Sequence, residues 1–91
     1  MANSFSGTVT IVNQLGLHAR AATKLALLCQ KFDAHIELQQ EHKTADASSV
    51  LALLMLASSK GKDVTVVASG AEAEQALSAV IELIASGFEE N

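Results

Sequence analysis

The feature that most constrains this chain is a hydrophobic spacing that switches repeatedly between the period of a strand and that of a helix. Apolar residues alternate along 5–12 and again along 63–68, which is typical of strands with one buried face. They recur at helical spacing after 17, up to about 32, and again from 73 to 84. This mixture, in only 91 residues, predicts one α+β domain spanning 1–91.

Three further segments complete the predicted order of elements. A strand is expected over 34–39, a shorter polar strand over 42–45, and an apolar helix over 50–57. The order is therefore strand, helix, strand, strand, helix, strand, helix. A sheet with all three helices on one face would bury every apolar stripe. Its other face would stay exposed to water and carry Thr8, Thr10, Glu37 and Thr65.

Polar residues beside the last two helices predict where those helices begin and end. Ser48 and Ser49 are good N-cap residues for the 50–57 helix, as is Asp46, and Lys60-Gly61 is expected to stop it. Ser69 and Glu72 have the spacing of a capping box, in which each side chain bonds the backbone of the other residue. The last helix is therefore expected to begin just after Ser69.

Composition excludes several classes of function. The net charge is −4, only six residues are basic, and Phe is the only aromatic type, so nucleic-acid binding is not expected. No apolar run approaches the roughly 20 residues of a membrane span, so no membrane insertion is expected, and the first four residues do not resemble an export signal. A cytoplasmic protein is expected. Cys29 is the only cysteine, and neither a metal site nor a cofactor is expected.

The junction 16–22 is the most informative stretch for function, because a strand hands over to a helix there. Gly16 suits a tight turn, and His18 stands where a capping Ser, Thr, Asp or Asn is usual. Free backbone N–H groups at such a helix start, here those of Ala19 and Arg20, together with the helix dipole, make an anion site that would fit phosphate. Spacing alone equally allows a plain turn followed by a solvated Arg20.

The residue types at this junction suit phosphoryl transfer. Neutral histidine is a competent nucleophile, so His18 could accept a phosphoryl group. The planar guanidinium of Arg20 could bind two phosphate oxygens, and Lys24 could add positive charge.

The stretch Gly16-Leu17-His18-Ala19-Arg20 resembles the active-site signature of the HPr family of phosphocarriers. The likeness continues through 32–34, 49–56, 60–61, 79–81 and 86–88, and these stretches resemble the nitrogen-related branch of that family. The resemblance implies an open-faced sandwich of a four-stranded antiparallel sheet and three helices. Ala21 departs from the family pattern, where many members have Pro, and a slightly frayed first helical turn is expected.

The resemblance also implies partners and roles for the residues. His18 would be phosphorylated by phospho-enzyme I of the phosphotransferase system (PTS) and would pass the group to a histidine of an EIIA-type protein, while Arg20 steadies the phosphoryl group. Ser49 aligns with a serine that an HPr kinase phosphorylates in some relatives; it could equally be only an N-cap. The runner-up function is a regulatory binding module of the same fold that acts by contact. A monomer is expected.

The helix over 50–57 is apolar all round, so one face cannot bury it completely. We expect Leu53, Leu56 and Ala57 to face the core, which leaves outward an apolar docking patch for partners. The patch would comprise Val50, Leu51 and Leu54, with Met55 a further candidate. A deeply buried short helix is the alternative.

Three other features of the sequence are assigned no role in function. His35 and His42 lie among polar residues and are expected to be solvated. The acidic end, 89–91, is expected to be a frayed tail.

Overall fold

Seven elements follow one another in the predicted order. The computed structural model describes residues 4–90. The elements are β1 (Ser4–Thr10), α1 (Ala19–Cys29), β2 (His35–Gln40), β3 (Lys43–Asp46), α2 (Val50–Leu56), β4 (Asp63–Ser69) and α3 (Ala73–Ala85). The predicted α+β class and the βαββαβα order are confirmed.

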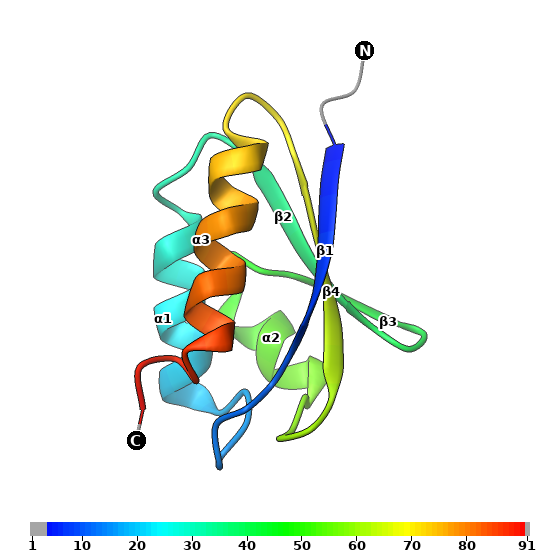
Figure 1. Ribbon diagram of the computed structural model, residues 1–91, viewed down its shortest axis with the longest axis vertical. Helices are drawn as coiled ribbons and strands as arrows, with labels where there is room; N and C mark the ends of the chain where they lie inside the picture. The colour runs from blue at the N-terminus through cyan, green and yellow to red at the C-terminus, as the bar shows by residue number, and fades with distance from the viewer. Residues whose placement is uncertain (1–3, 91) are drawn as a thin grey trace.

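The four strands form one antiparallel sheet in the order β1-β4-β2-β3. Figure 1 shows the three helices on the same side of this sheet, with the other side left open. β4 lies between β1 and β2 and forms hydrogen bonds with both strands. Its inward residues, Val64, Val66 and Ala68, are completely buried under the helices.

The open face of the sheet is polar, as predicted. Thr8 and Thr65 stand opposite each other and their hydroxyl oxygens are 3.3 Å apart. Thr10 donates a hydrogen bond to Asp63 across the same pair of strands. These cross-strand contacts let the outer face of the sheet remain in water.

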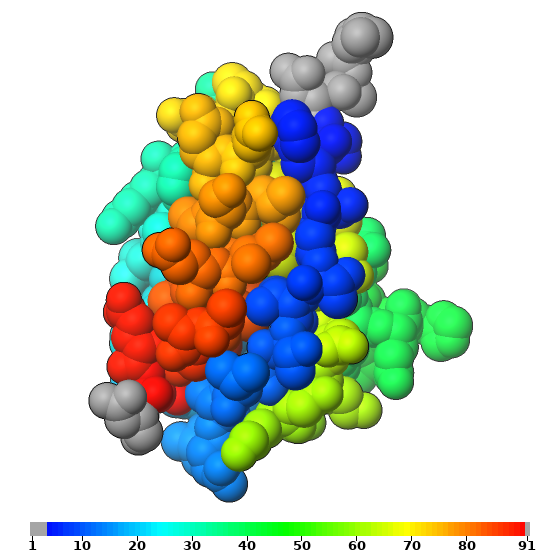
Figure 2. Space-filling model, viewed as in Figure 1, coloured from blue at the N-terminus to red at the C-terminus, as the bar shows by residue number. Residues whose placement is uncertain are grey.

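Helix α3 lies against β1 along much of its length, as the orange and blue atoms of Figure 2 show. Gly7 of β1 makes this close packing possible, because a Cβ atom there would lie 2.7 Å from Cδ1 of Ile81. The small residue therefore lets the Ile81 side chain reach the strand.

The start of α3 differs from the predicted capping box. Ser69 is the last residue of β4, and Glu72 is the N-cap, with no hydrogen bond from its side chain to the helix. Glu72 instead pairs with Asp33: its carboxylate accepts from the Asp33 N–H at 2.7 Å, and its own N–H donates to the Asp33 carbonyl at 2.9 Å. The prediction was wrong because a tertiary contact with the loop after α1 takes the Glu72 side chain.

Helix α2 begins as predicted and ends earlier. The Ser49 hydroxyl accepts from the Ala52 N–H at 3.1 Å, which confirms Ser49 as the N-cap. The helix stops at Ala57, whose φ of 56° is left-handed and whose side chain is exposed, so the stop at Lys60-Gly61 and the core position of Ala57 were wrong. The chain turns there because the Ser58 carbonyl accepts from the Leu17 N–H at 2.9 Å.

Gly16 adopts a conformation that only glycine reaches without strain. Its φ is +65°, and a Cβ atom would lie 2.7 Å from the Ser58 carbonyl oxygen and 2.8 Å from the Ser59 Cα. The turn before α1 is thereby packed directly on the backbone of the segment that follows α2. This contact determines where α1 starts.

Replacing Gly16 by Ala should therefore destabilise the fold by about 2–4 kcal/mol, the sum of a left-handed backbone and a backbone clash. Gly61→Ala is the matched control: its φ is +92°, yet nothing lies within 4 Å of the added Cβ. The free energy of unfolding of Gly61→Ala should fall by only about 1–2 kcal/mol. Urea denaturation of both variants measures the difference, and equal losses would contradict the clash.

Candidate functional site

His18 occupies the N-cap of α1, between the Gly16 turn and the first helical residue. Its backbone is extended, with φ −83° and ψ −178°, and its carbonyl accepts the first helical hydrogen bond, from the Ala22 N–H at 2.8 Å. Leu17, just before it, is buried in the core. The side chain of His18 is 23% exposed, so the ring is accessible while its backbone is held on both sides.

The Nδ1 atom of His18 caps its own helix. It accepts from the backbone N–H of Arg20 at 3.3 Å. The expectation of a helix start without a side-chain acceptor was therefore wrong, because the imidazole takes the part that Ser or Asp usually plays. Accepting a hydrogen bond requires a lone pair, so Nδ1 carries no proton in this arrangement.

The other ring nitrogen of His18 contacts a carboxylate. Nε2 lies 2.6 Å from Oε2 of Glu90, whose Oε1 accepts from the Asn13 side-chain N–H at 3.0 Å. The Asn13 hydrogen bond, and secondarily His18, hold the pKa of the Glu90 carboxyl below its ordinary value. An ionised carboxylate only accepts, so the proton of the neutral ring belongs on Nε2. Both contacts thus favour one tautomer, in which the lone pair of Nδ1 can act as the nucleophile.

The acidic C-terminal segment is packed on this site, which corrects the expected frayed tail as far as residue 90. Phe88 is fully buried, and its carbonyl accepts from Lys24 Nζ at 2.9 Å. Figure 1 shows the chain after α3 returning beside the start of α1. Lys24 thus binds the tail, and Asn91 lies outside the described residues.

Asn13 and Glu90 are the site residues that sequence reasoning missed. Asn13 is buried, and its side-chain N–H also donates to the Gly16 carbonyl at 2.8 Å, so it joins the turn to the tail. Neither residue belongs to a periodic pattern. The sequence contains Glu90 and His18, but no motif or spacing indicates that the two side chains meet.

Arg20 projects from the first turn of α1 into solvent. Its side chain is 68% exposed, and its Nε lies 3.5 Å from Oε2 of Glu90. The guanidinium therefore stands beside the His18 ring with most of its donors available. Ala21 follows inside the regular helix and is buried, so the helix begins at Ala19 without proline.

Helix α2 carries an exposed apolar surface, the α2 patch, formed by Leu51, Leu54 and Met55. Leu51 and Met55 are 69% and 70% exposed, which rules out the deeply buried helix. Leu53 and Leu56 face the core as predicted. Val50, which was predicted to lie in the docking patch, is instead half-buried because it packs against the core. Leu15, in the turn before His18, is also exposed and was not predicted to be.

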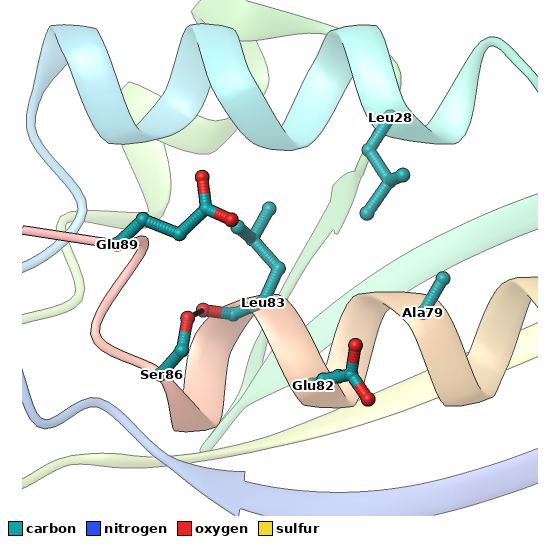
Figure 3. A pocket seen from close by; sticks show the side chains of 6 residues that line it. All are labelled: Leu28, Ala79, Glu82, Leu83, Ser86 and Glu89. Carbon is teal, nitrogen blue, oxygen red and sulfur yellow. Dashed lines mark hydrogen bonds between the residues drawn. The ribbon is translucent and has the colours of Figure 1, made fainter.

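A shallow groove runs between α1 and α3, away from these features. Figure 3 shows the six residues that line it, with Ser86 donating to the Leu83 carbonyl. Its lining includes Leu28 and Glu89 but not His18. This groove is therefore separate from the His18 ring.

Residues 4–90 contain neither a cluster of metal ligands nor a membrane-spanning helix. No group of three or more His, Cys, Asp or Glu side chains is placed to hold a metal ion. No helix in this range is both long enough and apolar enough to cross a bilayer. His35 lies on the open face, where its Nε2 is 3.0 Å from Glu37, and His42 is exposed in the turn between β2 and β3.

An open-faced sandwich with an accessible histidine at a helix start, an arginine beside it and an apolar patch nearby in the fold defines a phosphocarrier-like domain. The chain matches the family described as "PTS HPr component phosphorylation site" over residues 5–86. The protein belongs to the HPr family of phosphocarriers of the phosphotransferase system.

Two curated relatives are phosphocarrier proteins of the NPr type. The chain is 53% identical to "Phosphocarrier protein NPr" of Escherichia coli K12 over 85 residues, which covers 92% of this chain and 94% of the relative. It is 52% identical to the NPr of Shewanella violacea over 82 residues, or 90% of each chain. Both matches span nearly the whole length of each protein.

Solved structures show the same fold. HPr-C-His from Thermoanaerobacter tengcongensis superposes with a TM-score of 0.91 at 33% identity, covering 96% of this chain and 98% of the other. HPr from Bacillus anthracis superposes with a TM-score of 0.86 at 28% identity, covering 90% and 98%.

The Glu90 contact should make stability depend on pH. Its folded-state pKa lies below the ordinary value of 4.5, so its contribution to stability is fully present above pH 4.5 and is lost as pH falls through the folded pKa. Wild type should therefore be more stable than Glu90→Gln at neutral pH, and the two should converge in acid. Urea midpoints from pH 7 down to pH 3 measure this, and a constant difference across that range would contradict it.

Proposed function

We propose that this protein accepts a phosphoryl group on His18 from phospho-enzyme I and passes it to a histidine of an EIIA-type protein. The observation that carries the proposal is the position of His18: its side chain is 23% exposed, its Nδ1 accepts from the Arg20 N–H, and the residue caps the positive end of a helix. Family membership supplies the reaction class, and the NPr relatives favour the nitrogen-related branch, in which the acceptor is regulatory.

The transfer needs little besides positioning. The Nδ1 lone pair attacks phosphorus, an N–P bond forms, and the bond that joins phosphorus to phospho-enzyme I breaks, with its electron pair returning to enzyme I. The proton on Nε2 stays in place, so the His18 ring becomes a cation while the phosphoryl oxygens bring negative charge. Phosphoryl transfer of this kind is catalysed mainly by alignment and by electrostatic stabilisation.

Two groups beside His18 can meet the new negative charge. The Arg20 N–H, which now donates to Nδ1, would be released and can donate to a phosphoryl oxygen together with the Ala19 N–H. The Arg20 guanidinium is exposed enough to turn from Glu90 to the phosphoryl group, which it can bind with two donors.

Partners would dock over the α2 patch. An exposed apolar cluster on a helix that packs against α1 is the usual mark of a protein interface. Ser49 caps this helix, so its phosphorylation by an HPr kinase would place negative charge at the edge of the docking surface and weaken binding. It would also disturb the hydrogen bond that the Ser49 hydroxyl now accepts from the Ala52 N–H. The protein would act as a cytoplasmic monomer.

Incubation with enzyme I and phosphoenolpyruvate tests the proposal. Wild type should gain one acid-labile phosphoryl group, and His18→Ala should lose the label to background because the nucleophile is gone. Arg20→Ala should keep the site and slow the transfer about 10-fold or more, the effect of losing one charged donor. A wild type that is not labelled would instead favour the binding module that acts by contact alone. Label that persists in His18→Ala would show that another residue is phosphorylated.

The docking surface has a separate test. Leu51→Glu should lower the kcat/KM of transfer from enzyme I about 10-fold or more, because a buried charge replaces an apolar contact at the interface. The fold should be unchanged, since Leu51 is exposed.

Leu27→Glu is the matched control for Leu51→Glu. Leu27 is an exposed leucine of α1, 56% accessible, in a hollow that Lys24 and Lys31 also line. Equal effects of the two substitutions on transfer would argue against a specific patch on α2.

A further inference from the structure

The segment after α3 is ordered by specific contacts, and its backbone conformation is strained. Gly87, Phe88 and Glu89 have φ values of 73°, 58° and 62°, so three successive residues are left-handed and two of them are not glycine. Such residues persist only where the surroundings hold them, and they gather at functional sites. The Phe88 N–H donates to the Leu83 carbonyl at 2.9 Å, and the Glu90 N–H to the Gly87 carbonyl at 3.1 Å.

The result of this turn is to bring one carboxylate to the His18 ring. Both oxygens of Glu90 are engaged: Oε1 by Asn13, and Oε2 by Nε2 of His18, with Nε of Arg20 at 3.5 Å. The side chain is 16% exposed, so it is largely shielded from water. Glu89, its neighbour, is 72% exposed and lies 3.9 Å from Lys24. Only one of the two acidic side chains is held at the site.

Glu90 also lies outside the part of the chain that defines the family. The family match covers residues 5–86, and the segment that carries Glu90 follows it. The family match therefore does not imply the contact between Glu90 and His18.

We propose that Glu90, held by Asn13, is a positioning residue for phosphoryl transfer: it keeps the proton of His18 on Nε2 and stabilises the ring cation formed when Nδ1 is phosphorylated. The proposal rests on the function proposed above. A carboxylate hydrogen-bonded to the far nitrogen of a histidine orients the ring and raises its basicity in the same way at other sites.

The charges decide the sign of the effect. Phosphorylation on Nδ1 leaves the Nε2 proton where it is, so the ring gains a positive charge directly against the Glu90 carboxylate. The phosphoryl oxygens gather on the opposite side of the ring, where Arg20 and the helix start can meet them. These donors offset the phosphoryl charge, whereas the ring cation is hydrogen-bonded directly to the carboxylate, so attraction to the ring outweighs the remaining repulsion and Glu90 favours the loaded form.

Two measurements on the whole protein test this. The first is the equilibrium of phosphoryl exchange between enzyme I and the carrier. Glu90→Gln keeps the shape of the side chain and removes its charge, so the equilibrium should move toward phospho-enzyme I about 10-fold. Glu89→Gln removes the same charge one residue earlier and should leave the equilibrium at the wild-type value.

The second measurement uses the unphosphorylated protein and the ring ¹⁵N chemical shifts of His18. Wild type should show one neutral tautomer, with the proton on Nε2, and Glu90→Ala should show a mixture of both. A purely structural role of the tail would not change the tautomer, and Glu89→Ala should keep the wild-type spectrum.

The proposal is overturned if Glu90→Gln and Glu89→Gln have the same exchange equilibrium, or if Glu90→Ala keeps the single tautomer of wild type. These outcomes are separate from a failure of the proposed function. That failure would appear as a wild type that enzyme I and phosphoenolpyruvate do not label, whatever the tautomer spectra show.

Discussion

Burial of one face of β4 under the three helices is the contact on which the rest of the structure depends. β4 pairs with both β1 and β2, and its inward side chains, Val64, Val66 and Ala68, have no exposure to water. Each helix completes this core from a different part of the chain. The loops that join strands to helices at the end of the sheet near His18 are therefore brought together by the core itself, and the site needs no pocket of its own.

Much of this architecture could be predicted because it repeats along the chain. Alternation in β4 and the helical stripe of α3 ending at Ile84 predict which faces are buried, and the structure agrees. In β1 the predicted inward face is only half-buried at Gly7 and Val9, and Phe5 is exposed. Ends of helices were less predictable, since they depend on single contacts with distant residues. Glu72 bonds Asp33 instead of closing a capping box, and the chain leaves α2 at Ala57 to meet Leu17.

The site divides in the same way. His18 and Arg20 could be predicted because they stand together in a short motif at a strand-to-helix junction. Asn13 and Glu90 are 77 residues apart and belong to no motif, yet Asn13 holds the carboxylate of Glu90 that contacts the ring. The acidic end looked solvated because its composition says nothing of the left-handed turn at Phe88 and Glu89 that directs Glu90 inward.

The self-capping of α1 by His18 gives the helix start a second property. Nδ1 has one lone pair, and it can either accept from the Arg20 N–H or form a bond to phosphorus. A full carrier and an empty one therefore differ in what closes the first turn of the helix: phosphoryl oxygens in one, the bare ring in the other. A partner that contacts this turn meets a different surface in each state, so it can distinguish the phosphorylated carrier from the unphosphorylated one without any rearrangement of the fold.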